Sequence, residues 1–223
     1  MAATAAALVL ALLVCAAAYA ENYTFKRTKA GDATVGAMTL RKTDFPASFG
    51  LTGGRVKPDE TPNNDTCNGY LPKEHDLVIT GDAESRFHDS ARSVIVDSQV
   101  SMFQSTAMAT TDVQRSKRML AAACQAQAAK QEHVELVSFS VLGRPKCSCD
   151  FGVSVMLETK TAQANLDDLT IVTAIQKGRF EAVVFTDAGK LTNNPQSAAA
   201  ATRAALALQG LAVKTVLTRL HAL

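Results

Sequence analysis

The sequence predicts an α+β fold in which an antiparallel β-sheet packs against a central helix and a long C-terminal helix. Three observations lead to this prediction. Between residues 133 and 186, segments of strand character follow one another without helices, and such a succession favours antiparallel pairing. Helix signals occur near residue 111 and again at Pro195. Finally, 223 residues that are 47% hydrophobic can form a packed core without a structural metal.

Residues 1–20 predict a signal peptide, because they carry no charge and end in the small-x-small pattern Ala18-Tyr19-Ala20. The apolar run within them is shorter than the ~20 residues that span a membrane. We therefore expect a secreted or cell-surface chain, residues 21–223, with no membrane span after removal of the signal. No Lys or Arg precedes the run, so a retained anchor is an alternative. Lipidation at Cys15 is disfavoured, because Val14 stands where a lipobox has a small residue.

The mature chain is expected to be one domain, with an irregular N-terminal part at 21–75 and the sheet and helices at 76–223. Residues 32–40 are consistent with a short helix that ends before Pro46, since the residue preceding a proline disfavours helical angles. Residues 50–71 are rich in Gly, Pro, Asn and Thr and are predicted to form the longest loop.

The ordered part begins with predicted strands at 77–80, 84–88 and 93–104, where Val and Ile recur at alternate positions. Thr111 and Gln114 then have capping-box spacing, which predicts the start of the central helix. Its apolar stripe is expected to contain Val113, Leu120, Cys124 and Ala128. Its wet face is expected to contain Arg115, Arg118, Gln125 and Lys130.

Four further strands are predicted at 133–142, 149–159, 169–176 and 179–186, with a tight hairpin at Lys177-Gly178. The C-terminal helix is the most clearly marked element, because Asn194 is a good N-cap and Pro195 suits the first helical position. Gly210 within it is expected to mark a kink or a close approach to the sheet. The inward face of this helix is expected to carry Leu206, Val213, Leu217 and Leu220.

Four cysteines follow the leader: Cys67, Cys124, Cys147 and Cys149. In an oxidising compartment they permit three pairings, between which the sequence does not choose. We favour Cys67 with Cys124, which would tie the long loop to a helix and stabilise the fold by roughly 4 kcal/mol on the chain-entropy model. Cys147 and Cys149 can join only where the backbone bends, because residues two apart in a strand lie near the ~6.8 Å limit for a disulfide.

Charge and motifs exclude several function classes. A net charge of +2 with 20% charged residues is too balanced for a nucleic-acid-binding protein. Glu74-His75-Asp76 and His88-Asp89 are interpreted as solvated turn residues, and no metal, cofactor or catalytic motif has the required spacing. We therefore expect no enzyme activity, no cofactor and no metal. Cys147 and Cys149 provide the one alternative with chemistry, thiol–disulfide exchange or a soft-metal site.

Short motifs in a fixed order resemble those of uncharacterised secreted actinobacterial proteins. They begin with Asp44-Phe45-Pro46 and Cys67 and continue with DLVITGDAES at 76–85, SQVSMF at 98–103 and Cys124. Leu142-Gly143, the strands with Lys177-Gly178-Arg179 and the C-terminal helix extend the resemblance over most of the mature chain. More distantly, the order of elements is similar to the extracellular sensor domain of PknH-type receptor kinases and to cell-envelope lipoproteins with a PsbP-like fold.

This resemblance implies an antiparallel sheet flanked by helices, no catalysis and a cleft for an unidentified ligand. It also implies two disulfides between successive cysteines, Cys67 with Cys124 and Cys147 with Cys149, although the second pair is spaced more tightly here than in the sensor domains. We therefore interpret the chain as a non-catalytic, monomeric binding or sensor-like domain of the bacterial cell envelope. Its partner would be an unknown small molecule or envelope component. A thiol–disulfide exchange protein and a structural envelope protein are the alternatives.

Overall fold

The computed structural model describes residues 23–58, 77–89, 91, 93–131, 133–161, 166–191 and 194–222. The predicted signal peptide, residues 59–71 of the predicted loop and residues 72–76 lie outside this set. The strands are β1 (Tyr23–Phe25), β2 (Thr52–Val56), β3 (Leu77–Asp89), β4 (Val94–Phe103), β5 (Val134–Gly143), β6 (Phe151–Thr161), β7 (Leu166–Lys177) and β8 (Phe180–Leu191). The helices are α2 (Lys29–Met38), α3 (Thr106–Met119), α4 (Ala122–Gln131) and α5 (Pro195–His221), with short 3₁₀ helices at Lys42–Asp44 and Ala47–Phe49.

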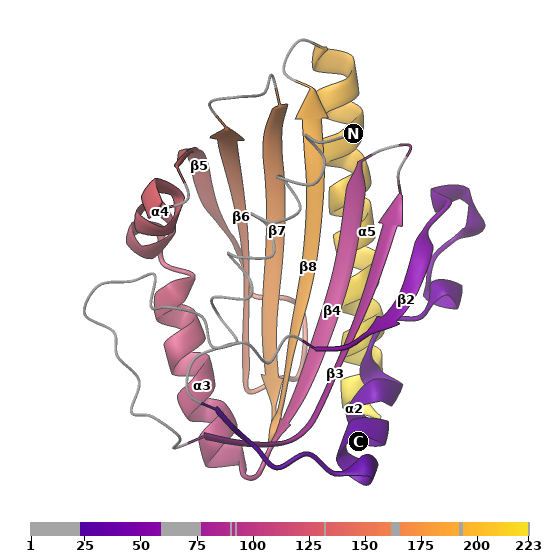
Figure 1. The fold of residues 1–223 in the computed structure, drawn as a ribbon, viewed down its shortest axis with the longest axis vertical. Helices are drawn as coiled ribbons and strands as arrows, with labels where there is room; N and C mark the ends of the chain where they lie inside the picture. The colour runs from indigo at the N-terminus through magenta and orange to yellow at the C-terminus, as the bar shows by residue number, and fades with distance from the viewer. Residues whose placement is uncertain are drawn as a thin grey trace.

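One 8-stranded sheet, in the order β1-β3-β4-β8-β7-β6-β5 with β2 also paired to β3, forms the centre of the molecule (Figure 1). The pairs are antiparallel except for β1, which runs parallel to β3. The predicted α+β class is confirmed, and the long C-terminal helix is confirmed with it. Strands 77–80 and 84–88 are one continuous strand, β3, because its backbone pairs with β4 along nearly its whole length.

The two faces of the sheet differ in what they pack against. Helices α2 and α5 cover one face, which we call the helix face, and they lie behind the sheet in Figure 1. The main core forms there, between these helices and alternate residues of β3, β4, β7 and β8. A smaller apolar cluster occupies the opposite face, where Leu120 contacts Val155, Val172 and Phe185.

The C-terminal helix α5 begins where the sequence predicts. Asn194 accepts a hydrogen bond from the Ser197 backbone N–H at 3.1 Å, and Pro195 occupies the first turn. The predicted inward face is wrong in part, since Leu217 and Leu220 are buried but Leu206 is 44% exposed. Small side chains form the contact with the sheet instead and let the helix lie close to it. The buried stripe is Ala201, Ala205, Leu208, Gln209, Ala212, Val216, Leu217 and Leu220.

A buried glutamine fixes α5 on the sheet. Gln209 is 6% exposed, and its side-chain oxygen accepts a 2.6 Å hydrogen bond from the Thr186 hydroxyl of β8. Its amide nitrogen donates to the Thr173 hydroxyl of β7 at 2.9 Å and to the Val184 carbonyl at 3.1 Å. These three bonds specify one position of the helix, because sliding α5 by one residue would leave buried polar groups unpaired.

The central helix departs from its prediction. The chain forms two helices, α3 and α4, and α3 starts at Thr106 because the Ser105 hydroxyl accepts a hydrogen bond from the Met108 N–H. Thr111 lies inside α3 and donates to the Ala107 carbonyl, so the predicted capping box is wrong. The predicted apolar stripe is confirmed as buried. Gln125, predicted to face water, is 5% exposed.

The predicted irregular N-terminal part contains the expected short helix and also two strands, β1 and β2, that the sequence pattern did not indicate. Helix α2 begins at Lys29, earlier than expected, because the Thr28 hydroxyl caps it by accepting from the Gly31 N–H at 2.9 Å. Strand β2 lies within the predicted loop at 50–71, which is therefore wrong for these residues. Gly53 is needed there for close approach, since it has φ 137° and a Cβ atom would lie 2.1 Å from the Arg86 carbonyl oxygen.

Arg219 joins the end of α5 to this N-terminal part. Its guanidinium donates to both carboxylate oxygens of Asp44, at 2.6 and 2.9 Å, and to the Thr39 carbonyl. Bidentate, partly buried pairs of this kind are stronger than exposed ion pairs. In the described part of the chain, no helix has the length and hydrophobicity that crossing a membrane requires.

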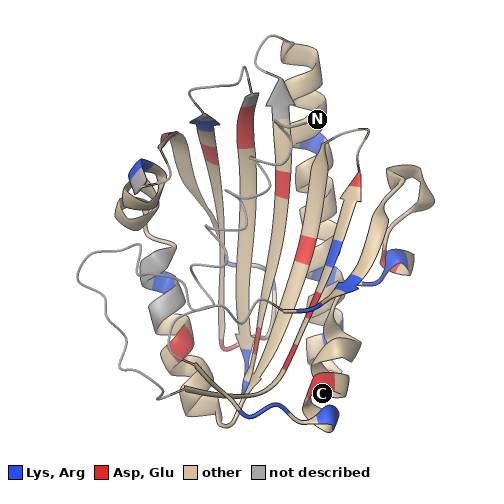
Figure 2. Ribbon diagram, viewed as in Figure 1, with Lys and Arg blue, Asp and Glu red and all other residues tan. Residues whose placement is uncertain are grey.

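Acidic residues occupy neighbouring strands on the face opposite α5, from β3 across β4 and β8 to β7 (Figure 2). Arg86 neutralises part of this charge through ion pairs with Glu84 at 2.6 Å and Asp97 at 2.7 Å. Asp187 accepts a hydrogen bond from the Thr170 hydroxyl. Its burial, together with the nearby Asp168 carboxylate, raises the pKa of Asp187 to about 8.

We expect Gln209→Leu to lower the free energy of unfolding by about 2 kcal/mol, because Thr173, Thr186 and the Val184 carbonyl lose buried hydrogen-bond partners. Urea denaturation measures this change. The variant T173V/T186V/Q209L should recover part of the loss, since both hydroxyls are removed with their partner. A Gln209→Leu protein as stable as the wild type would contradict the role given to this side chain.

We expect the free energy of unfolding to fall as pH rises from about 4 to 8. In that window the folded state keeps the Asp187 proton, whereas the unfolded state, with an ordinary pKa of about 3.9, has lost it. Asp187→Asn should flatten the fall between pH 6 and 8 and make the variant more stable than wild type at pH 8. A pKa difference of one unit between the folded and unfolded states changes the free energy of unfolding by about 1.4 kcal/mol. Even a fraction of the Asp187 shift therefore gives a measurable change. The exposed Glu135→Gln variant is the control and should keep the wild-type slope.

Candidate ligand groove

A groove of about 570 Å³ lies on the helix face, between α5, the strands β6 and β7 and the loop that joins β5 to β6. Its volume falls in the ~300–1,000 Å³ range of small-molecule sites. The groove exists because α5 covers β4, β7 and β8 and leaves the helix face of β6 open along its flank.

One face of α5 forms the long wall of the groove. The residues on this wall recur every three or four positions from Leu206 to His221, which corresponds to about 22 Å of helix. They are Leu206, Gln209, Gly210, Val213, Lys214, Leu217, Thr218 and His221. Leu206 and Val213, which the sequence pattern placed on the inward face, thus lie beside the core contact and line the groove.

Gly210 keeps this wall open. No atom lies within 4 Å of the position that a Cβ atom would occupy there, and α5 continues through it as one helix from Pro195 to His221. The prediction that Gly210 marks a close approach to the sheet is therefore wrong. Its missing side chain leaves space in the groove, not contact with a strand.

The floor of the groove combines an apolar side chain, Ile171, with a chain of hydrogen bonds. Gln209 donates to the Thr173 hydroxyl, and Thr173 and Ser154 lie 2.9 Å apart. Thr173 is 1% exposed, so its own hydrogen needs an acceptor, and Ser154 is within reach. With Ser154 accepting from Thr173, the Ser154 hydroxyl hydrogen is available to a molecule in the groove.

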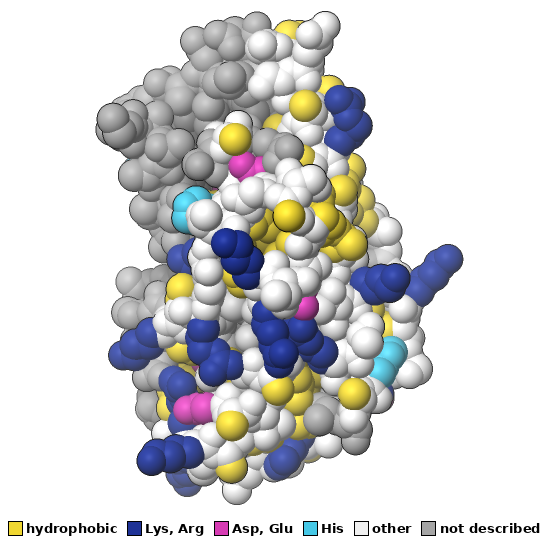
Figure 3. Space-filling view, turned by 90° about the vertical axis from the view of Figure 1, so that its right-hand side faces the viewer, with side chains coloured by type: hydrophobic (Ala, Val, Ile, Leu, Met, Phe, Trp, Pro, Cys, Tyr) yellow, Lys and Arg dark blue, Asp and Glu magenta, His cyan; other side chains and the backbone are white. Residues whose placement is uncertain are grey.

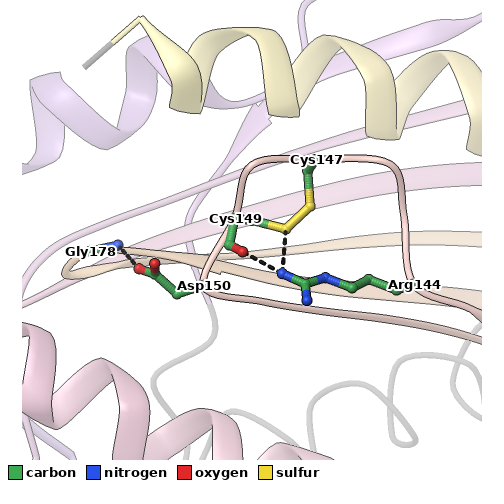
Figure 4. Close-up of a disulfide and its surroundings, with 5 residues drawn as sticks. All are labelled: Arg144, Cys147, Cys149, Asp150 and Gly178. Carbon is green, nitrogen blue, oxygen red and sulfur yellow. Dashed lines mark hydrogen bonds between the residues drawn. A yellow bond between two sulfur atoms is a disulfide. The ribbon is translucent and has the colours of Figure 1, made fainter.

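The loop between β5 and β6 forms the second wall, and a disulfide shapes it. Cys147 and Cys149 are bonded, with Cα atoms 5.2 Å apart, so the backbone bends here as the sequence analysis requires (Figure 4). Arg144 folds back beneath the loop and donates to the Cys149 carbonyl. Asp150 accepts a 2.7 Å hydrogen bond from the Gly178 N–H, which holds the loop to the β7–β8 turn.

The charged side chains in the described lining of the groove are basic. Arg144, Lys146 and Lys214 are exposed cations on its walls, and none of the described residues that line it is acidic. Helix α5 runs antiparallel to β8, so its C-terminus lies near the β7–β8 turn, to which Asp150 holds the loop that carries Arg144 and Lys146. Lys214 lies midway along the α5 wall. Leu206, which is about half exposed, is the lining residue of α5 farthest from that C-terminus, and the half-exposed Leu142 adjoins the loop.

A second hollow of about 260 Å³ lies between α2 and β2, with Arg41, Lys42 and Arg55 on its walls. Figure 3, which views the molecule from the β2 side, shows many Lys and Arg side chains and few acidic ones. This hollow is smaller, and the Arg55 guanidinium fills part of it by packing on Gly36, where a Cβ atom would lie 1.8 Å from a guanidinium nitrogen. The larger groove is therefore the stronger candidate site.

The remaining sequence candidates do not form a site in the described part of the chain. The exposed His88 imidazole lies 3.0 Å from the Thr52 hydroxyl, whereas Asp89 accepts from the Ala91 N–H, so the two side chains do not converge. Glu74-His75-Asp76 lies outside the described residues. Among residues that the structure places, no three His, Cys, Asp or Glu side chains are arranged to hold a metal ion.

Cys124 is disulfide-bonded. Cys67 lies outside the described residues, so its pairing with Cys124 stays a prediction. The groove residues Ser154, Thr173 and Gln209 were missed by the sequence analysis. The one available signal was Gln209 itself, a polar residue that falls in the apolar periodicity of α5.

Comparison with known proteins adds a structural neighbour. The fold is similar to the crystal structure of the extracellular domain of PknH from Mycobacterium tuberculosis, with a TM-score of 0.50 and 13% sequence identity. The match covers 86% of this chain and 97% of that chain. No protein-family model matches the sequence, and no curated protein does. At this identity the likeness concerns the fold alone, and at that level it confirms the resemblance to PknH-type sensor domains.

Proposed function

We propose that this chain is a non-catalytic, sensor-like domain that works outside the cytoplasm and binds a small molecule in the groove beside α5. The observation that carries the proposal is the groove itself, a site with a long apolar wall, a hydrogen-bonding floor and basic side chains on its walls. An extracytoplasmic place is supported by the leader-like residues 1–20 and by a neighbour that is itself an extracellular domain. In this proposal, residues 21–223 act as one domain.

The groove residues favour binding over catalysis. Ser154 is the hydroxyl best placed on the floor, and its recorded hydrogen-bond partner is Thr173, a neutral hydroxyl. A nucleophilic serine needs a base within hydrogen-bond reach, and the groove lining that the structure describes gives Ser154 none. Ser154 is therefore suited to recognising a ligand oxygen.

Thiol–disulfide exchange at Cys147 and Cys149 is the alternative with chemistry. Cys149 is 7% exposed, and the Arg144 guanidinium lies over it, so an attacking thiolate has poor access to this sulfur. The position of the disulfide in the loop that carries Arg144 and Lys146 supports a structural role, in which it holds these two groove residues beside the site.

Filling the groove at Gly210 tests the proposal. We expect Gly210→Phe to lower the affinity for the neutral probe N-phenyl-1-naphthylamine at least tenfold, and to remove small molecules that wild type retains on purification. Phenylalanine has a higher helix propensity than glycine, so the fold should persist.

Gly210→Ala is the matched control. It adds only a methyl group, should keep probe binding and should raise the free energy of unfolding by about 0.5–1 kcal/mol. Fluorescence titration, native mass spectrometry and thermal unfolding report the three effects. Equal probe binding and equal retention in wild type and Gly210→Phe would overturn the proposed site.

A second experiment separates binding from exchange. We expect wild type not to accelerate the reduction of insulin by dithiothreitol, and C147S/C149S to behave the same way in that turbidity assay. The variant should still bind the neutral probe, with reduced affinity, because the loop wall becomes less constrained. Acceleration by wild type that disappears in C147S/C149S would establish exchange activity instead.

A further inference from the structure

We propose that the groove beside α5 takes a single-chain anionic amphiphile, with its negative headgroup among Arg144, Lys146 and Lys214 and its apolar chain along α5. This inference rests on the proposed function and specifies its ligand class. The occupant to which we commit is a carboxylate on an unbranched hydrocarbon chain.

The headgroup assignment follows from the cations. Lys146 and Lys214 are exposed, lie on opposite walls of the same groove and have no acidic neighbour in the described lining. Arg144 uses part of its guanidinium to donate to the Cys149 carbonyl, and a guanidinium carries five N–H groups. Basic groups on both walls can therefore approach one anion from two sides, which charge complementarity favours.

The dipole of α5 explains only part of the positive charge near its C-terminus. Cations near a helix C-terminus stabilise the helix dipole, and Arg219 in the last turn of α5 serves that purpose. Lys214 lies two turns before the end of the helix, and Arg144 and Lys146 are on another element. These three residues face the groove without helping the dipole of α5.

The tail assignment follows from the rest of the lining. Leu142, Leu206 and Val213 leave apolar surface unburied along the walls. Among the residues that the structure describes, two of the four exposed large hydrophobics, Leu142 and Leu206, lie here. A linear hydrocarbon chain can lie along such an elongated groove and bury its methylene groups, one after another, against these apolar side chains.

The length of the site favours a linear molecule over a compact one. Leu206 and Lys214 lie eight residues apart, about 12 Å along the α5 wall, so a ligand that touches both has to be extended. Ser154 on the floor offers a hydroxyl hydrogen to a carboxylate oxygen. A neutral amphiphile of equal length would bring no negative charge to these cations, and a cationic one would be repelled by them.

Isothermal titration of the full chain with dodecanoate, dodecan-1-ol and dodecyltrimethylammonium tests the headgroup. We expect dodecanoate to bind at least tenfold more tightly than the other two. Octanoate should bind more weakly than dodecanoate, by up to about fourfold for each methylene removed, and acetate should not bind measurably.

Charge variants separate the groove from general electrostatics. We expect K146Q/K214Q to weaken dodecanoate binding about tenfold and to leave dodecan-1-ol binding unchanged. K29Q/K117Q removes the same charge from exposed lysines outside the groove and should bind dodecanoate like wild type.

The outcomes distinguish the ligand class from the site. If dodecanoate binds no better than dodecan-1-ol, or if K29Q/K117Q weakens it as much as K146Q/K214Q, the ligand class is wrong. The proposed function still stands in that case, provided that Gly210→Phe abolishes binding of the neutral probe. If Gly210→Phe changes no binding at all, the site itself is wrong.

Discussion

The position of α5 on the sheet decides most of what this molecule presents to its surroundings. Gln209 sets that position, because its three hydrogen bonds to β7 and β8 are satisfied in only one placement of the helix. The small residues Ala201, Ala205 and Ala212 allow the helix to lie close to the strands at that place. A helix fixed over β8 cannot also cover β6, so an open flank follows, and the groove occupies it.

The sheet has two faces with different physical character. On the helix face, burial is apolar and close-packed around α5. On the opposite face, burial and then the nearby Asp168 carboxylate raise the pKa of Asp187, and Arg86 neutralises only Glu84 and Asp97. Because Asp187 is protonated in the folded state, the protein is more stable at mildly acidic pH. The pH dependence of stability thus arises from the face opposite the groove.

The sequence predicted the elements with strong local signals and missed those that depend on tertiary partners. Asn194-Pro195 marked the start of α5, and alternation of Val and Ile marked β3 and β4. Strand β2 was predicted as loop, because its glycines are typical of a turn. Their role depends on a tertiary contact, since the Arg86 carbonyl of β3 lies against Gly53. The groove was not predictable, since it lies between elements and depends on which flank of α5 stays uncovered. Periodicity assigned Leu206 to the inward face, yet this side chain is 44% exposed. The helix-breaking tendency of glycine indicated a kink or a close approach at Gly210, but no atom lies near its Cβ position.

The order of strands in the sheet also has a consequence for how the protein is made. Strand β4 pairs with β8, whose partner residues lie some ninety positions later, as in Val94 with Ala188. The apolar helix face is covered only when α5, the last element of the chain, has docked. Contacts between such distant segments slow folding. A nascent chain therefore exposes an uncovered sheet until α5 has been made, and a chain that lacks α5 should leave apolar surface exposed and aggregate.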